Sequence, residues 1–303
     1  MDTFQLCHAD AERAAWSFDE SVRGLEFDFQ KRFLPSCICG QSLPEWLDST
    51  ARLKLNQIRG FSYAHIFLFV ESLIIEQTCS SALGYVHEDN EALSALVRFT
   101  EEETKHQRMF ELVKDRLVQG FGFTPGELGD KEGIARSVNE KPPFSVFLLI
   151  LVLEWLTQRH YVECFKDEEV ELDPGFVTVF RLHWTEEAQH ARMDAVQLRR
   201  LAASMSRREI EVAAGDFVGL LRLFGSLLSE QDQLDLQSLE QVQGETFSPE
   251  QREELLACLN REWIWTFLVS GLEHAAFRSV FQAVVPEELL SFGELNKVLD
   301  WEE

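Results

Sequence analysis

The chain has 303 residues, of which 45% are hydrophobic, and only 16 glycines and 8 prolines. This composition suits a helical globular protein with a substantial core and argues against disorder. The formal net charge of −24 argues against a nucleic-acid backbone or an anionic membrane as a partner. We expect most of this charge on solvated helical surfaces, with a docking face for a basic electron-donor protein as the alternative.

The cysteines and the N-terminus give little sign of export. The first eight residues lack a basic segment followed by an apolar one, so no signal peptide is expected. The longest apolar run, residues 146–153, ends at Glu154 and is too short to cross a bilayer. The six cysteines form no Cys-x-x-Cys pair, and Cys37 and Cys39 stand as a lone Cys-x-Cys. A reducing cytoplasm is the expected location.

Clusters of Pro and Gly separate long stretches without helix breakers. Gly60 precedes one apolar stretch, residues 87–90 form a turn with capping side chains, and residues 120–143 form a long connection. Asp173-Pro174 and Ser248-Pro249 each supply an N-cap followed by proline at the first helical position. The predicted helices cover about 45–58, 62–85, 91–119, 144–166 and 174–204, with further helices near 207–228 and 249–284.

This order of helices predicts an all-α fold without strands. Two helical hairpins joined by one long crossover form the arrangement of ferritin-like four-helix bundles. We therefore expect one domain over residues 1–303, with a four-helix core at 62–204. Residues 1–61 and 205–303 would form helical flanks at the two ends of the chain.

One motif occurs twice, once in each hairpin. Residues 102–109 and 186–193 both read Glu-Glu-x-x-His-x-Arg-Met. A single Glu-x-x-His is weak evidence, but two copies with matching flanks in matching positions are not expected by chance. Residues i and i+3 share one face of a helix, so a carboxylate and an imidazole there can bind the same ion. Pairs of such motifs hold two iron or two manganese ions in four-helix bundles.

Such a site also needs one carboxylate from each of the other two helices. Antiparallel partners meet at equal distances from their turn. In the first hairpin Glu71 lies 16 residues before the turn centre and Glu103 lies 16 after it, whereas Glu76 lies only 11 before. Glu71 is therefore predicted to face the motif.

The second hairpin gives a matching result. Glu154 lies 16 residues before the turn centre and Glu187 lies 17 after it, whereas Glu163 lies only 7 before. Glu71 and Glu154 both sit inside apolar runs, where an unpaired carboxylate has a large desolvation cost. The alternative is that each lies on an exposed edge of its helix or pairs with a buried arginine.

His183 breaks the symmetry of the repeat. It lies one turn before Glu187 and shares a helix face with Glu187 and His190, whereas the matching position in the first motif is Phe99. A histidine on an apolar face is usually a hydrogen-bonded core residue. Here we expect it to join His190 on one ion, leaving the other ion with His106.

The complete pattern resembles the p-aminobenzoate N-oxygenase (AurF-like) family of non-haem di-iron oxygenases, and the resemblance covers about residues 62–204. It implies four glutamates and three histidines as ligands, with the third histidine on the helix of the second motif. Glu102 and Glu186 would orient metal-bound histidines, or else form ion pairs with Arg108, Arg192 or a neighbouring helix. The implied metal ligands are Glu71, Glu103, His106, Glu154, His183, Glu187 and His190.

The remaining candidate residues are assigned structural roles. His65, His87, His160 and His274 have no partner at ligand spacing and are expected in the core or at the surface. Tyr63 and Tyr161 are expected to line a pocket or the core.

The leading functional hypothesis is a di-iron oxygenase with O₂ as co-substrate, because a carboxylate-rich site suits iron or manganese better than zinc. The resemblance implies an arylamine nitrogen as the oxygen acceptor. The alternatives are hydroxylation, desaturation or oxidative cleavage of an acyl chain, a non-enzymatic iron-binding protein, or a catalytically inactive bundle that acts as a scaffold. An external donor of the reductase or ferredoxin type would supply electrons, and a homodimer is a candidate assembly.

Overall fold

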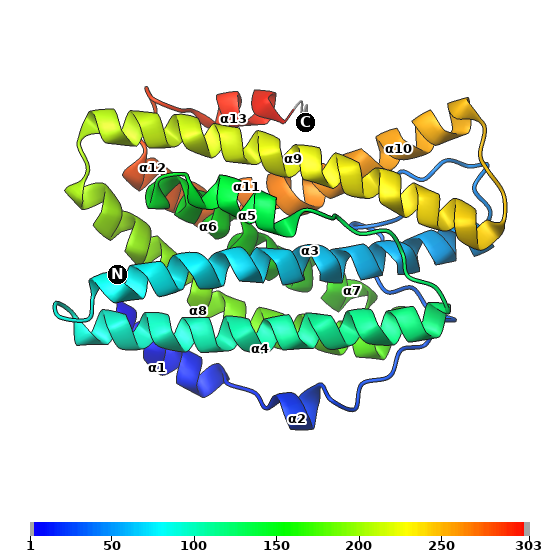
Figure 1. The fold of residues 1–303 in the computed structure, drawn as a ribbon, viewed down its shortest axis with the longest axis horizontal. Coiled ribbons are helices and arrows are strands. Elements are labelled where there is room, and N and C mark those ends of the chain that lie inside the picture. Colours follow the sequence, from blue (N-terminus) through cyan, green and yellow to red (C-terminus); the bar gives the residue numbers. More distant parts are fainter. Residues whose placement is uncertain (1–2, 300–303) are drawn as a thin grey trace.

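The computed structural model describes residues 3–299, and these are organised almost entirely as helices (Figure 1). No β-strand occurs in this part of the chain, where a single isolated bridge joins Arg32 and Leu172. The predicted all-α class is confirmed. The α-helices are α1 (Phe4–Ala14), α2 (Phe18–Ser21), α3 (Ser49–Gly84), α4 (Asn90–Phe121), α5 (Lys131–Asn139), α6 (Pro143–His160), α7 (Lys166–Glu168), α8 (Pro174–Ser204), α9 (Arg207–Gln243), α10 (Pro249–Ile264), α11 (Ser270–Leu272), α12 (Ala275–Val284) and α13 (Phe292–Val298), and two π-helical segments cover Tyr161–Phe165 and Trp265–Val269.

A ferritin-like bundle of four helices forms the centre of the molecule. Helices α3 and α4 pack along each other as one hairpin, and α6 and α8 form the second (Figure 1). Helix α4 also contacts α8, and α3 contacts α6, which closes the bundle. The crossover between the hairpins contains the short helix α5, whose first turn is capped by Asp130. The predicted arrangement of two hairpins and one crossover is confirmed.

Side-chain caps fix where these helices begin. Asp48, Asp89 and Asp173 accept hydrogen bonds from backbone N–H groups in the first turns of α3, α4 and α8. Ser206 and Ser248 form reciprocal capping boxes at α9 and α10. Each cap satisfies backbone donors that have no partner within the helix. The capping side chains predicted at residues 87–90, before Pro174 and before Pro249 are all present.

The prediction of a helix break before residue 62 is wrong. Helix α3 runs without interruption through Gly60. A β-carbon at this position would lie 3.0 Å from Cβ of Phe33 and 3.2 Å from Cζ of Phe176. Gly60 therefore serves close packing of α3 against these two rings rather than a turn, which explains how the helix tolerates it.

Other boundaries differ as well. Helix α6 ends at His160 and continues as a π-helical turn, and α9 extends to Gln243 instead of ending near residue 228. The stretch predicted as one helix over 249–284 contains a second π-helical turn and a break at His274, whose side chain caps α12. These departures depend on tertiary contacts that periodicity does not report.

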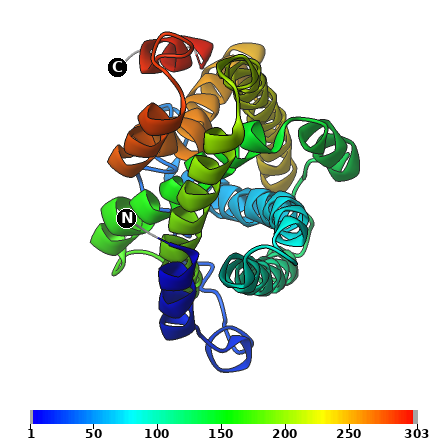
Figure 2. The same cartoon turned by 90° about the vertical axis from the view of Figure 1, so that its left-hand side faces the viewer.

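The flanking helices cover the bundle on two sides. Helix α1 packs across α4 and α8, whereas α9 packs over α3 and α6 (Figures 1 and 2). Helix α6 is apolar around its circumference up to Glu154 and lies buried between these layers. Helices α3 and α9 are long and apolar enough to cross a membrane by length and composition alone, and 83% and 44% of the most apolar window of each is buried inside the protein. The core helices of soluble proteins share this length and composition.

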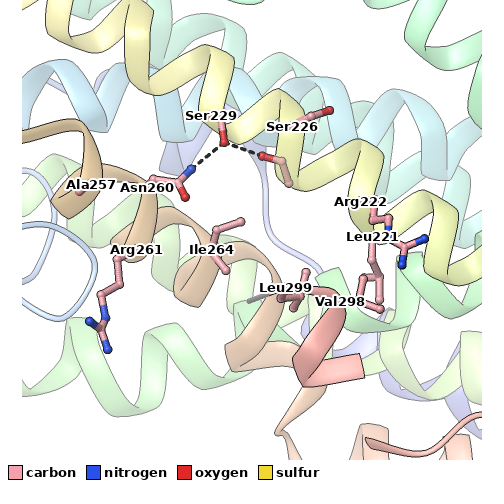
Figure 3. A pocket seen from close by; sticks show the side chains of 11 residues that line it. Leu221, Arg222, Ser226, Ser229, Ala257, Asn260, Arg261, Ile264, Val298 and Leu299 are labelled. Atoms are coloured by element: carbon pink, nitrogen blue, oxygen red, sulfur yellow. Dashed lines mark hydrogen bonds between the residues drawn. The ribbon is translucent and has the colours of Figure 1, made fainter. Parts of the chain in front are cut away.

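A surface cavity of about 640 Å³ lies between α9, α10 and α13 (Figure 3). Leu221 and Ile264 contribute apolar walls, Arg222 and Arg261 project at two ends, and Asn260 donates a hydrogen bond to Ser229. None of the residues that line it belongs to the four bundle helices. The cavity is therefore separate from the site formed by the repeated motif.

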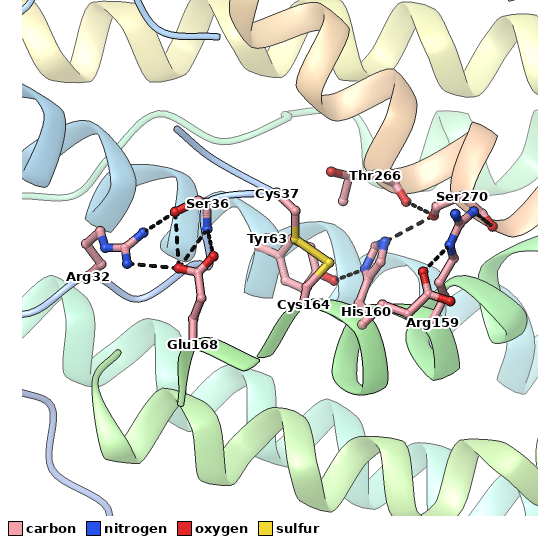
Figure 4. Close-up of a disulfide and its surroundings, with 11 residues drawn as sticks. Arg32, Ser36, Cys37, Tyr63, Arg159, His160, Cys164, Glu168, Thr266 and Ser270 are labelled. Atoms are coloured by element: carbon pink, nitrogen blue, oxygen red, sulfur yellow. Dashed lines mark hydrogen bonds and ion pairs between the residues drawn. A yellow bond between two sulfur atoms is a disulfide. The ribbon is translucent and has the colours of Figure 1, made fainter. Parts of the chain in front are cut away.

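A disulfide joins Cys37 to Cys164, whose Cα atoms are 6.3 Å apart (Figure 4). It connects the loop before α3 to the π-helical turn after α6. The two cysteines are separated by 127 residues, so no local sequence motif predicts that they pair. Cys39, the other half of the Cys-x-Cys pair, is a free, buried thiol.

Candidate metal centre

The two copies of the repeated motif meet inside the bundle. Glu103 and His106 project from α4, and Glu187 and His190 project from α8, and all four side chains are buried. Nδ1 of His106 lies 3.2 Å from Glu103 and 3.0 Å from Glu187. Nδ1 of His190 lies 2.7 Å from Glu103 and 3.3 Å from Glu187. One donor atom from each residue fits within a 4.8 Å group, which is compact enough to hold a metal ion.

A second group of donor atoms adjoins the first. Glu71 from α3 and His183 from α8 join His106 and Glu187, again with all donor atoms within 4.8 Å of one another. Nε2 of His183 lies 3.0 Å from Glu71 and 2.8 Å from Glu187. His106 and Glu187 belong to both groups, so the two candidate ion positions lie side by side.

Glu154 completes the set from α6. Its carboxyl group is buried, and burial followed by the neighbouring carboxylate of Glu187 raises its pKa well above the usual range. The two rival carboxylates point elsewhere: Glu76 is exposed and contacts Asn139, and Glu163 is exposed and pairs with Arg159. The equal-distance rule for antiparallel helices therefore selected the inward-facing glutamates.

His183 takes a different neighbour from the one expected. The sequence predicts that it shares an ion with His190, leaving His106 on the other. In the structure its ring lies 4.7 Å from the ring of His106, and its donor atom groups with those of His106 and Glu71. Phe99, the counterpart of His183 in the repeat, stacks on the His190 ring at 4.1 Å. The pairing of His183 with His190 remains a prediction.

Glu102 and Glu186 contact the outer nitrogens of the motif histidines. Nε2 of His106 lies 3.0 Å from Glu186, and Nε2 of His190 lies 3.0 Å from Glu102. Each glutamate thus reaches the histidine of the other helix. This placement is the one expected of residues that orient metal-bound histidines.

Each of these outer glutamates also has a cation: Glu186 takes one from the neighbouring helix, which was one of the expected alternatives, whereas the partner of Glu102 comes from its own helix. Arg98 holds Glu102 at 2.9 Å, and Lys105 pairs with Glu186. Arg192 pairs instead with Asp10 at 2.6 Å, and the guanidinium of Arg108 lies over the Phe18 ring. Each glutamate thus contacts a histidine and is also paired with a cation, and its role in orienting a metal-bound histidine remains a prediction.

Three residues near the centre escaped the sequence reasoning. Trp16, from the loop after α1, stacks on His106 with ring centroids 6.2 Å apart, and Lys105 lies over the same indole. Asp194 is fully buried one turn beyond His190, and neither of its carboxylate oxygens has a hydrogen-bond partner within residues 3–299. The sequence could have indicated Asp194, because the matching position next to the first copy of the motif is Phe110. No sequence pattern indicates that Trp16 contacts the centre.

The buried carboxyl groups of the centre repel one another when they are ionised. Burial raises the pKa of Glu71 and Glu154 well above the usual range, and the facing carboxylates of Glu103 and Glu187 raise it further. Burial also opposes ionisation of Glu103, but the charge of His190 holds the pKa of Glu103 at about 2. Carboxylates that face each other in a dry site repel unless a proton or a cation lies between them.

The donor set fits two divalent cations. Oε2 of Glu71 and both carboxylate oxygens of Glu154 accept no hydrogen bond from any residue that the structure describes. Buried carboxylate oxygens without donors have a high cost unless they bind a metal. With two divalent ions bound in place of the protons on these carboxyl groups, four ionised glutamates would balance the charge of the ions, and the histidines would add neutral nitrogen donors.

The family comparison agrees with this geometry. A model of the family described as p-aminobenzoate N-oxygenase AurF matches residues 27–258. The match extends beyond the bundle in both directions, into the loop before α3 and into α10. No curated protein and no solved structure shows a significant match to the chain.

Proposed function

Because the chain belongs to the p-aminobenzoate N-oxygenase AurF family, and is therefore an oxygenase, we propose that it uses two iron ions and O₂ to oxidise the nitrogen of an arylamine. The observation that carries the proposal is the buried set of four glutamates and three histidines from four helices. Carboxylate-rich sites favour iron or manganese, whereas zinc favours four ligands with more nitrogen or sulfur. Iron bound here would supply the redox chemistry that activates O₂.

The chain's own residues set the orientation of the histidines. Glu186 and Glu102 accept the Nε2–H groups of His106 and His190, which fixes the tautomer of each ring. Nδ1 of each ring is then the free donor atom, and it points at Glu103 and Glu187. The metals would therefore be held through Nδ1 on both motif histidines.

Aromatic rings keep water from the centre. Phe67 and Phe110 contact the His183 ring edge to face, with centroids 5.1 and 5.0 Å away. Phe99 covers His190 on the other side. Excluding water strengthens the electrostatic interactions in the site and protects a reactive oxidant from side reactions. An apolar aromatic wall also suits a flat aryl substrate.

The proposal is tested by assaying amine oxidation with the reconstituted protein. Protein loaded anaerobically with ferrous iron should convert p-aminobenzoate or a related arylamine to N-oxygenated products when O₂ and a chemical reductant are added. Glu154→Ala protein should form none, whereas Glu163→Ala, which alters an exposed glutamate two turns away, should match the wild type. Iron-loaded protein that consumes O₂ but never oxidises an arylamine nitrogen would contradict the proposed substrate class.

A further inference from the structure

A second buried polar chain lies outside the metal centre, where α3, α6 and α11 meet (Figure 4). The hydroxyl of Tyr63 lies 2.6 Å from Nδ1 of His160, and Nε2 of His160 lies 3.0 Å from the hydroxyl of Ser270. The Ser270 hydroxyl donates at 2.7 Å to the carbonyl oxygen of Thr266. All four residues are buried.

These contacts fix the direction of every hydrogen bond. Because Ser270 uses its only hydroxyl hydrogen on Thr266, it must accept from the Nε2–H of His160. The Nδ1 atom of His160 then carries no hydrogen and accepts from the Tyr63 hydroxyl. Burial lowers the pKa of His160 to about 3, so the imidazole is neutral. Tyr63 therefore donates to a neutral, unprotonated nitrogen.

The backbone is irregular next to both His160 and Ser270. A π-helical turn begins directly after His160, and a second one ends directly before Ser270. Insertions of this kind are rare and occur frequently at functional sites. Here one of them adjoins His160 and the other adjoins its partner Ser270. A core needed only for stability could have used apolar side chains without the desolvation cost of Tyr and His.

Aromatic rings connect this pair to the metal centre and to the surface. The Phe67 ring lies 4.9 Å from that of Tyr63 and 5.1 Å from that of His183. The Trp265 ring stacks on His160 with centroids 5.8 Å apart and is partly exposed. Tyr63 thus stands between the candidate metal ligands and a ring that reaches solvent.

We propose that Tyr63 is a redox-active residue. It would give one electron to a metal centre that O₂ has oxidised, and at the same time its phenolic proton would pass to Nδ1 of His160. The O–H bond of Tyr63 breaks, an N–H bond forms on His160, and the oxidised metal centre gains one electron. Tyr63 becomes a neutral phenoxyl radical beside an imidazolium ion. The external electron donor then returns an electron by way of Trp265, and the proton moves back. This proposal rests on the proposed oxygenase function. The electron transfer would remove one oxidising equivalent from the metal centre when no arylamine is bound to consume it.

The other tyrosines provide matched controls, since the chain has only three. The Tyr85 hydroxyl donates to the amide oxygen of Gln197, a group that does not accept a proton at neutral pH. Tyr161 stacks on Trp184, and no hydrogen bond from its hydroxyl occurs in the described part of the chain. Only Tyr63 combines a basic partner with a path to the metal centre.

The first experiment mixes ferrous protein with O₂ without arylamine and records electron paramagnetic resonance spectra of samples frozen at short times. Wild-type protein should show a radical whose spectrum narrows when tyrosine is ring-deuterated. Tyr63→Phe should abolish it, and Tyr85→Phe and Tyr161→Phe should retain it. His160→Gln keeps a hydrogen-bond acceptor but no basic nitrogen, so the rate of radical formation should fall by about 100-fold or more, the contribution expected of a positioned proton acceptor.

The second experiment removes the dependence on metal. Metal-free protein is flash-oxidised with a photogenerated ruthenium(III) complex, and the phenoxyl radical is followed by transient absorption in the same variants. A radical that depends on Tyr63 and His160 supports the pair as a redox unit even if iron binding fails. The proposal is overturned if the radical persists in Tyr63→Phe at wild-type yield. It is also overturned if iron-loaded protein that turns over O₂ shows no tyrosine radical.

Discussion

Nε2 of His106 on α4 lies 3.0 Å from the carboxylate of Glu186 on α8, and His190 on α8 makes the same contact with Glu102 on α4. Each motif thus supplies the group that orients the histidine of the other. The doubled glutamate in each motif therefore has two roles, since the second glutamate faces the centre and the first turns the opposite imidazole. This crossed arrangement couples the two helices through the proposed metal ligands.

Removing Glu186 should weaken metal binding without removing a ligand. In Glu186→Ala protein the His106 ring loses its acceptor and its fixed tautomer, so metal affinity should fall about 10–100-fold. Competition with a fluorescent chelator measures the change. Glu101→Ala is the control, because Glu101 lies next to Glu102, pairs with the same Arg98 and is 70% exposed. Equal affinities in the two variants would contradict the orienting role.

The two carboxylates from the other bundle helices should be essential for metal content. Glu71→Ala and Glu154→Ala remove buried oxygen donors that no side chain can replace, so bound metal should drop from two ions to one or fewer per chain. Glu76→Ala and Glu163→Ala alter exposed residues and should leave the content intact. Elemental analysis of purified protein decides between them. Loss of metal from the second pair would refute the assignment.

His183 should act as a nitrogen ligand of one ion. His183→Ala leaves six of the seven proposed ligands, so the protein should fold and keep both metals, while its rate of O₂ consumption and its product distribution change. A structure of the iron-loaded protein should place a His183 nitrogen about 2.1 Å from one ion, the usual metal–nitrogen distance. A distance above about 3 Å would exclude coordination. The same structure would show whether the partner histidine on that ion is His106 or His190.

Close backbone packing beside Glu154 should make Gly271 intolerant of substitution. A β-carbon at Gly271 would lie 2.2 Å from the carbonyl oxygen of Val152, two residues before Glu154 on α6. Gly271→Ala should therefore displace α6, destabilise the protein by about 1–3 kcal/mol or more, and lower metal content. A β-carbon added at Gly219 in α9 would meet no atom within 4 Å, so Gly219→Ala should stabilise the folded protein by about 0.5–1 kcal/mol. Thermal denaturation of both variants measures the contrast, and an unchanged Gly271→Ala protein would contradict it.

Much of the bundle could be predicted because its signals are local. Capping residues such as Asp173 mark helix starts, and the repeated motif places Glu103 and Glu187 on helix faces by spacing alone. Equal distance from a turn then selected Glu71 over Glu76, because antiparallel helices rise by the same length per residue.

The rest depends on contacts between distant segments. Gly60 looks like a breaker until the rings of Phe33 and Phe176 are seen against it. Likewise His160 has no partner at ligand spacing, because its partner is Tyr63 on another helix. The ring that reaches His106, Trp16, comes from a loop 90 residues away. Spacing within one helix does not report such contacts.

The most direct measurement of the central claim is metal stoichiometry after anaerobic reconstitution with ferrous iron. Six buried Glu and His donors in two adjoining groups, together with buried Glu154, predict close to two iron ions per chain, and at most one when either Glu71 or Glu154 is replaced. One ion per chain, or protein that retains only zinc after iron is supplied, would contradict the di-iron centre.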